Sequence, residues 1–306
     1  MRQSNAFLYG LTVLIWGSTW LAIEYQLGEI APEVSVFYRY AAAGALLFLW
    51  SGARRLPLKF PLRAHMFFMG LGACLFCLNY IVTYYAQQYI SSALTAIVFS
   101  TMLWMNMGNA RLFFGVRGDR QLVLGSIVGI AGIVCLFMPS MEASLSNATL
   151  LGGVLCLIGA FLASLGNMVS QAAQREALPV VQSNAYGMLY GAIFTGAIAA
   201  MQGQSFSFDS SLSYVLSLAY LVVFGSILGF WAYLTLLGRI GAHKAGYAMV
   251  TFPLVAMLLS VIFEDLTITP NLAIGAALVI VGNLLVLRRR ENAPQPAEGE
   301  VLVDTR

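Results

Sequence analysis

The chain has 306 residues, of which 59% are hydrophobic and only 9% are charged, whereas soluble domains carry roughly 25% charged residues. A soluble globule could not bury so much apolar surface, so the composition predicts a protein embedded in a bilayer. It excludes a disordered chain, a nucleic-acid module and most cytosolic enzymes. The net charge of +3 says little, because the placement of charges matters more than their sum in a membrane protein.

Ten mainly apolar runs follow one another, each close to the roughly 20 residues that a transmembrane helix needs. In chain order they cover residues 6–23, 32–50, 66–85, 92–114, 121–138, 150–171, 180–201, 212–236, 244–263 and 270–287. Residues 291–306, with two prolines and four acidic residues, are predicted to be a disordered cytoplasmic tail. The sequence therefore predicts an all-α polytopic membrane protein with ten transmembrane helices.

The basic residues predict the orientation of these helices. With the N-terminus inside, 15 of the 16 lysines and arginines fall in inner loops or tails, and the outer loops contain none. Cytoplasmic loops of membrane proteins carry such an excess of positive charge. Both termini are therefore predicted to be cytoplasmic, in a plasma (inner) membrane.

The second half of the chain repeats features of the first at offsets of 147 to 150 residues. The matched motifs are Gly125-x6-Gly132 with Gly275-x6-Gly282, and Pro32 with Pro179. The predicted repeats are residues 1–140 and 148–288, with five spans each. Because five is odd, the second repeat must enter the membrane from the opposite side, and such inverted repeats support alternating access.

Short motifs occur in a characteristic order along the chain. They are Trp16-Gly-Ser-Thr-Trp20 in the first run, Pro32-x6-Arg39-Tyr40 in the second, and Pro253 with Glu264-Asp265 in the ninth. With two five-span halves, the chain resembles the EamA-type transporters of the drug/metabolite transporter superfamily over about residues 6–288. The resemblance implies a ten-helix inner-membrane permease, often an exporter of amino acids, metabolites or toxic compounds. In the first half, Leu103 and Phe114 occupy the positions that match Pro253 and Glu264, so symmetrical proline kinks are not expected.

Arg39 is the one basic residue that lies inside a predicted span away from the cytoplasmic end of that span. It follows Pro32 by seven residues, which places it about 10 Å from the outer end of its helix. Charges at such depth usually line a cavity or pair with acids. Glu24 and Glu264 end two other helices on the same side, so we predict an outer gate formed by Arg39, Glu24 and Glu264. A guanidinium that holds a substrate carboxylate, a structural ion pair and outward snorkelling are the alternatives.

Other polar and aromatic side chains in the spans are expected to face the interior of the bundle, because hydrocarbon offers them no partner. Interhelical hydrogen bonding and a transport cavity both satisfy this requirement. Taken together, the set predicts a substrate cavity near the midplane, lined by Trp16, Asn79, Tyr80, Trp104, Asn106, Asn167, Trp231, Tyr247 and Thr251. Pro253 removes one backbone hydrogen bond and predicts a kink in the ninth helix.

These features favour a secondary transporter that exports a small metabolite, amino acid or xenobiotic by alternating access. No Gly-x4-Gly-Lys-Ser/Thr pattern occurs, so no nucleotide is expected, and neither is a cofactor, a metal or a nucleic acid. Protons are a candidate coupling ion, since a membrane potential of 100 mV supplies about 2.3 kcal/mol per charge. The alternative is a non-transporting membrane protein, either an intramembrane enzyme or a scaffold. Against an enzyme, His65 and His243 lie at span edges, away from any catalytic cluster.

Overall fold

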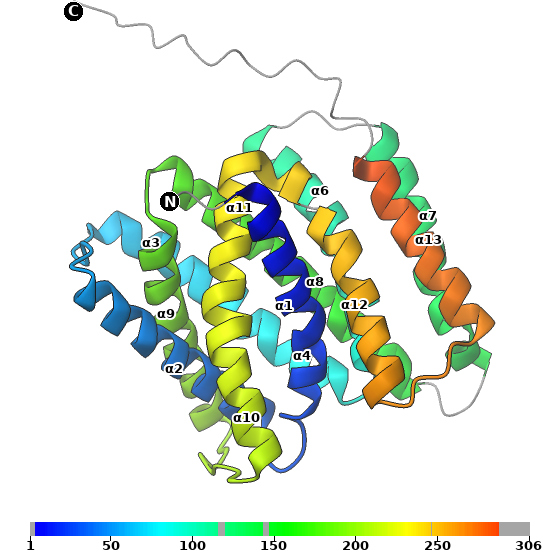
Figure 1. The fold of residues 1–306 in the computed structure, drawn as a ribbon, viewed down its shortest axis with the longest axis horizontal. Coiled ribbons are helices and arrows are strands. Elements are labelled where there is room, and N and C mark those ends of the chain that lie inside the picture. The colour runs from blue at the N-terminus through cyan, green and yellow to red at the C-terminus, as the bar shows by residue number, and fades with distance from the viewer. Residues whose placement is uncertain (1–3, 116–119, 143–146, 246, 288–306) are drawn as a thin grey trace, which may run out of the picture.

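The computed structural model describes residues 4–115, 120–142, 147–245 and 247–287, and the regular structure in these ranges is helical (Figure 1). The elements are α1 (Asn5–Glu24), α2 (Pro32–Ala53), α3 (Leu62–Leu71), η1 (Gly72–Leu78), α4 (Asn79–Gln87), α5 (Ser92–Phe99), α6 (Met102–Phe114), α7 (Arg120–Glu142), α8 (Asn147–Arg175), α9 (Val180–Met201), α10 (Leu212–Tyr220), η2 (Leu221–Leu228), α11 (Gly229–Ala245), α12 (Tyr247–Phe263) and α13 (Pro270–Leu287). The series α3–η1–α4, α5–α6 and α10–η2–α11 each form one helix, so the described segments make ten helices, the number predicted.

Several of these helices can cross a bilayer by length and composition. Five described helices are long and apolar enough, namely Asn5–Glu24, Pro32–Ala53, Leu62–Gln87, Asn147–Arg175 and Leu212–Ile240. Three shorter apolar helices are Val123–Leu136, Ala248–Phe263 and Pro270–Leu285. The prediction of a helical protein with several membrane spans is therefore confirmed.

The helices begin where the sequence supplies start signals. Pro32 and Pro270 are the first residues of α2 and α13, where a proline loses no hydrogen bond and its fixed φ suits the helix. The hydroxyl groups of Ser91 and Ser211 accept hydrogen bonds from backbone N–H groups in the first turns of α5 and α10. These serine caps satisfy backbone N–H groups at the helix starts and fix the residues at which α5 and α10 begin.

The third and eighth helices each contain a π-helical segment at equivalent positions. The segment η1 begins at Gly72 and η2 begins at Leu221, which agrees with the repeat offset seen in the sequence. Such segments are rare and are frequently found at functional sites. Each one directly precedes residues that line the central cavity described below.

The fourth helix is interrupted at Ser100 and Thr101, between α5 and α6. The Ser100 hydroxyl donates to the Ile97 carbonyl at 2.7 Å and accepts from Asn283 Nδ2 at 3.1 Å. Hydroxyl groups that bond to the backbone in this way bend helices. The ninth helix, α12, contains Pro253. Leu103 stands at the position that matches Pro253. The fourth helix is nevertheless interrupted close to this position, by the hydrogen bonds of Ser100 and not by a proline.

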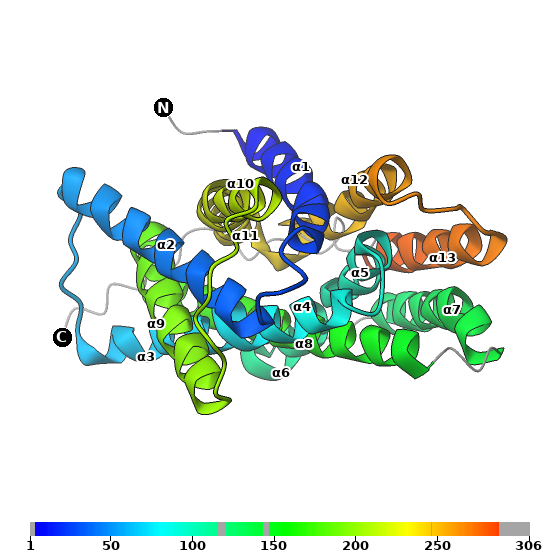
Figure 2. The same cartoon turned by 90° about the horizontal axis from the view of Figure 1, so that it is seen from below.

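Two pairs of helices at equivalent positions in the two halves, α2 with α9 and α7 with α13, pack against each other in antiparallel orientation. In α2 and α9, Phe48 meets Tyr186, whereas Gly196 meets Phe37 from the other end of α2. In α7 and α13, backbone contacts join Gly132 to Gly275 and Gly282 to Gly125. We refer to these four glycines of α7 and α13 as the glycine seam. Figure 2 shows the α2–α9 pair at one end of the molecule and the α7–α13 pair at the other.

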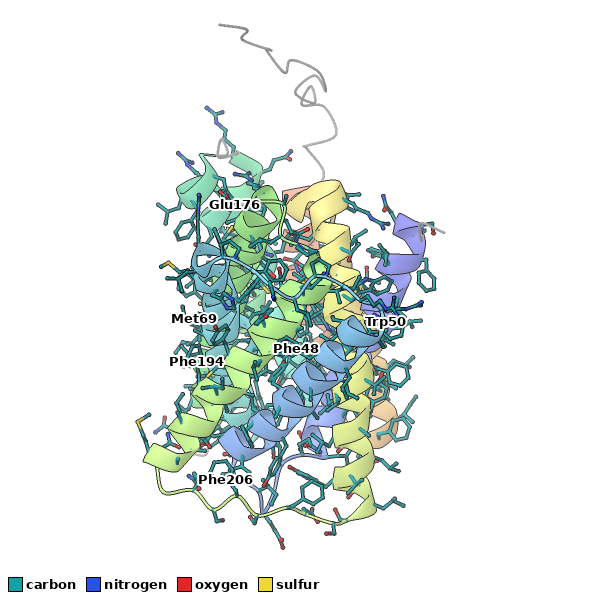
Figure 3. All side chains as sticks on the ribbon, turned by 90° about the vertical axis from the view of Figure 1, so that its left-hand side faces the viewer. Phe48, Trp50, Met69, Glu176, Phe194 and Phe206 are labelled. Carbon is teal, nitrogen blue, oxygen red and sulfur yellow. The ribbon has the colours of Figure 1, made fainter. Side chains whose placement is uncertain are left out.

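The remaining helices fill the space between these two pairs. The first helix, α1, packs on α12 and α11, and its counterpart α8 packs on α5, α6 and α4. The first helix of each half thus packs on helices of the other half. Figure 3 shows Glu176 and Phe206 at opposite ends of the bundle, as expected for loops on opposite sides of a membrane.

Candidate functional site

A narrow cavity lies between α1, η1, α4, α5, α6, α8, α11 and α12, and its accessible volume is about 30 Å³. It is lined by Trp16, Thr19, Trp20, Ile23, Leu75, Asn79, Tyr80, Thr83, Phe99, Met102, Ala163, Asn167, Phe230 and Phe252. No charged side chain is among these residues. The cavity is therefore an aromatic chamber with a few polar groups, as is common in small-molecule sites.

Aromatic rings form most of the cavity wall. The Trp20 ring lies 5.0 Å from Phe99 and stacks on Phe252 at 6.0 Å between centroids. The Trp16 ring meets Phe230 edge-on at 5.2 Å. The indole N–H groups of Trp16 and Trp20 are buried and have no hydrogen-bond partner among the described residues. Two donors at the cavity wall are thus left for an acceptor from outside the protein.

The polar groups of the cavity come mainly from α4 and α8. Asn167 Nδ2 donates to Asn106 Oδ1 at 3.2 Å and lies 3.5 Å from the sulfur of Met102. Asn79 Nδ2 reaches the Leu75 carbonyl in η1 at 3.4 Å. These bonds fix the asparagine side chains at the wall, so the polar groups are already in place before a ligand enters.

Residues from equivalent positions of the two halves meet in this cavity. The four pairs of lining residues are Trp16 with Ala163, Trp20 with Asn167, Tyr80 with Phe230, and Met102 with Phe252. Their offsets are 147 residues for the first two pairs and 150 for the others. Positions that are one repeat offset apart therefore line the same cavity.

Arg39 is fully buried behind the cavity wall. Its Nε donates to the Ser226 hydroxyl in η2 at 2.9 Å, and its Cζ lies 4.4 Å from the centre of the Tyr80 ring and 5.2 Å from that of Tyr40. Its Nη1 has no hydrogen-bond partner among the described residues. Removing such a charge from water costs several kcal/mol, and the faces of the aromatic rings and the Ser226 hydroxyl group offset this cost.

The predicted ion pair between Arg39 and the two acids is not formed in this structure. The salt bridge between Arg63 and Glu176, at 2.9 Å, involves none of these three residues. The prediction was wrong on this contact because depth in the membrane gives no information on the direction of a side chain around its helix. Arg39 points toward η2 and the tyrosines, where the chain places a hydroxyl group and π faces.

Glu24 and Glu264 lie together instead, at the ends of α1 and α12. Each carboxylate acts electrostatically on the other, and Glu24 Oε2 is buried with no hydrogen-bond partner among the described residues. Glu264 accepts from the Ser92 hydroxyl at 2.6 Å and from the Ser92 backbone N–H at 3.4 Å. This places its negative charge at the N-terminus of α5, where the helix dipole favours it. The pair therefore links three helices at one end of the cavity.

Of the nine residues predicted to line the cavity, Trp16, Asn79, Tyr80 and Asn167 do so, and Asn106 lies directly behind Asn167.

The other four predicted residues lie elsewhere or outside the described side chains. Trp104 packs on α7, where its ring occupies the space beside Gly129. Trp231 lines a separate hollow between α2, α9 and α11, together with Trp50, the residue labelled in Figure 3. The Thr251 hydroxyl is 2.6 Å from that of Tyr9 and joins α12 to α1. The side chain of Tyr247 lies outside the described part of the structure.

The sequence interpretation missed several lining residues that the repeat itself could have revealed. Applying the offset of 150 to Tyr80 gives Phe230, and applying it to Met102 gives Phe252. Both line the cavity. Within the described residues no group of three or more His, Cys, Asp and Glu side chains is placed to hold a metal ion.

Comparison with known proteins gives the family. The family model for the EamA-like transporter family matches the chain twice, over residues 4–138 and 150–288, which suggests an internal repeat. Protein PagO of Salmonella typhimurium is 25% identical over 304 residues, which cover 96% of this chain and 99% of PagO. The uncharacterized inner membrane transporter YedA of Escherichia coli (strain K12) is 31% identical over 251 residues, 80% of this chain and 78% of YedA.

A crystal structure with 18% sequence identity matches this fold with a TM-score of 0.69, over 95% of this chain and 100% of the other. The uncharacterized transporter YoaV of Bacillus subtilis (strain 168) is 23% identical over 286 residues, 91% of this chain and 96% of YoaV. The chain is thus an inner-membrane transporter and not an enzyme, and it belongs to the EamA-like transporter family.

Proposed function

We propose that the protein is a secondary transporter that exports a small molecule through the central cavity by alternating access. Its two units are residues 1–140 and 148–288, inserted in opposite orientations, with both termini and the tail 291–306 in the cytoplasm. One observation carries the proposal: equivalent residues of the two halves line one cavity. The antiparallel packing of α2 on α9 and of α7 on α13 agrees with it. Halves related in this way can exchange conformations, which moves the opening from one side to the other.

The interruptions in the helices support such a movement. The π-helical segments η1 and η2 adjoin the cavity in the third and eighth helices. The fourth helix is interrupted at Ser100 and the ninth contains Pro253, so a kink there remains part of the proposal. Each interruption removes regular backbone hydrogen bonds and gives the helix a point at which it can bend.

Glu24 and Glu264 are proposed as the outer gate and the site of proton coupling. Two carboxylates that act on each other repel when both are charged, and a proton bound to one of them relieves the repulsion. Ser92 in α5 donates a hydrogen bond to Glu264. Protonation of either carboxylate would therefore change the contacts between α1, α5 and α12. Arg39 is proposed to act at the substrate site instead, because it contacts the cavity residue Tyr80 and makes no salt bridge with either acid.

Alternating access is tested by cysteine accessibility in a cysteine-free background. Thr19 lines the cavity, and Thr19→Cys is a small change that replaces the hydroxyl group by a thiol and removes one methyl group. We expect a small membrane-impermeant methanethiosulfonate reagent to label it from either side of oriented vesicles. The control variants Glu176→Cys and Phe206→Cys lie at opposite ends of the bundle and should each be labelled from one side. Labelling of Thr19→Cys from one side alone would overturn the proposal.

A further inference from the structure

Three buried hydrogen-bond donors, one of them positively charged, lie at or directly behind the wall of the central cavity. These donors are Nε1 of Trp16, Nε1 of Trp20 and Nη1 of Arg39, and none of the three has a hydrogen-bond partner among the described residues. All three are buried, and Trp20 and Arg39 are more than nine-tenths buried as residues. No carboxylate lines the cavity. A ligand that supplies acceptors and one negative charge would satisfy groups that the protein leaves unpaired.

The guanidinium of Arg39 is separated from the cavity by the side chains of Tyr80 and Thr19. Both residues line the cavity. The Tyr80 ring covers the guanidinium at 4.4 Å. On the other side, Thr19 Cγ2 and Arg39 Nη2 meet at Gly225, where an added Cβ would lie 2.9 Å from the first atom and 3.1 Å from the second. A rotation of the Tyr80 side chain would therefore bring the positive charge to the cavity surface.

The absence of a side chain at Gly225 is what gives the guanidinium this position. Gly225 lies in η2 next to Ser226, whose hydroxyl accepts from Arg39 Nε. The segment η2 thus supplies both the space and the hydrogen bond that orient the guanidinium. Its Nη1 remains available, and a planar fork of N–H groups matches a carboxylate better than any other common anion-binding side chain.

We propose that the transported substrate is a planar aromatic monocarboxylate and that Arg39 binds its carboxylate. This inference rests on the proposed transport function and specifies its substrate class. The rings of Trp16, Trp20, Phe230 and Phe252 form the apolar wall for the planar part, and ring stacking favours a flat partner. A substrate with an ammonium group is disfavoured, since no carboxylate in the cavity would neutralise it.

The test uses four small probes that share one ring and differ in charge. They are phenylacetate (an anion), phenylacetamide (neutral), phenethylamine (a cation) and phenylalanine (a zwitterion). Binding to the purified full chain in detergent is followed by the fluorescence of the cavity tryptophans. We expect saturable binding of phenylacetate at least tenfold tighter than that of the other three. Equal or tighter binding of phenethylamine or phenylalanine, or binding of none of the four, would overturn the proposal.

Variants of Arg39 then assign the carboxylate contact. Arg39→Gln should weaken phenylacetate binding at least tenfold and leave the weak binding of phenylacetamide unchanged. Arg39→Lys keeps the charge without the planar fork and should restore part of the affinity. Arg63→Gln, which removes the arginine of the exposed Arg63–Glu176 pair, is the matched control and should bind like the wild type. If Arg39→Gln does not fold, the affinity of Arg39→Lys for phenylacetate is the test of the assignment. Unchanged phenylacetate affinity in either variant, once folded, contradicts the assignment.

The outcomes separate this proposal from the proposed function. If the protein exchanges phenethylamine but not phenylacetate across proteoliposome membranes, the transport function stands and the substrate class is wrong. If phenylacetate binds through Arg39 and no exchange of it occurs, the site is correct and the transport function is contradicted.

Discussion

The glycine seam between α7 and α13 gives a prediction whose size follows from the backbone geometry. A Cβ added at Gly282 would lie 2.5 Å from the Gly125 carbonyl oxygen and 2.8 Å from the Gly129 nitrogen. Ordinary contact begins at 3.4 Å, so Gly282→Ala must separate the two helices by roughly 0.9 Å, because backbone atoms cannot rotate away. Overpacking of this kind costs about 1–3 kcal/mol. We expect the melting temperature of the purified protein to fall by several degrees.

The symmetry of the seam makes this prediction sharper. A Cβ at the equivalent Gly132 would lie 2.7 Å from the Gly275 carbonyl oxygen, so Gly132→Ala should destabilise by a similar amount. Gly108→Ala is the control, because nothing lies within 4 Å of a Cβ at that helical position. Thermal unfolding in detergent, followed by loss of monodisperse protein, measures all three variants. If the melting temperatures of Gly282→Ala and Gly132→Ala equal that of Gly108→Ala, the close packing of α7 on α13 is wrong.

Three further outcomes are expected. Cysteine introduced at Glu29 should react with an impermeant reagent from outside and cysteine at Lys59 only from inside, and the reverse pattern would contradict the orientation. Glu24→Gln should remove the acceleration of transport by a pH gradient while exchange of substrate at equal pH persists, and retained acceleration would exclude Glu24 as the proton site. Asn167→Asp adds a negative charge to the cavity wall and should weaken phenylacetate binding at least tenfold, measured by tryptophan fluorescence, whereas unchanged affinity would place the carboxylate elsewhere.

Much of the fold could be predicted from the chain because membrane helices follow from composition. The apolar runs matched the helices, since a bilayer leaves the backbone no other way to satisfy its polar groups. Proline at positions 32 and 270 located two helix starts. The spacing Gly125-x6-Gly132, repeated as Gly275-x6-Gly282, predicted the repeat, and these glycines lie where the backbones of α7 and α13 approach each other. Glycine spacing is informative because only backbone atoms can approach so closely.

The site was harder to predict, because a sequence gives the depth of a residue and not its direction. Trp16, Trp104 and Trp231 all fall near the middle of their helices, yet only Trp16 lines the central cavity. Arg39 was expected to reach the acids that end two other helices on the same side of the membrane, and instead bonds to Ser226, 187 residues away in the sequence. The interruption at Ser100 also left little trace in the sequence, since it depends on a hydrogen bond with the distant Asn283.

Counterflow in proteoliposomes tests the central claim most directly. Vesicles containing the wild-type protein are loaded with unlabelled phenylacetate and diluted into a trace of the labelled compound, with Arg39→Gln vesicles as the comparison. A carrier that exposes one site to each side in turn must accumulate the label transiently above equilibrium, and we expect this overshoot for the wild type and at least a tenfold smaller one for Arg39→Gln. A monotonic approach to equilibrium at the same rate in both would contradict alternating access through this cavity.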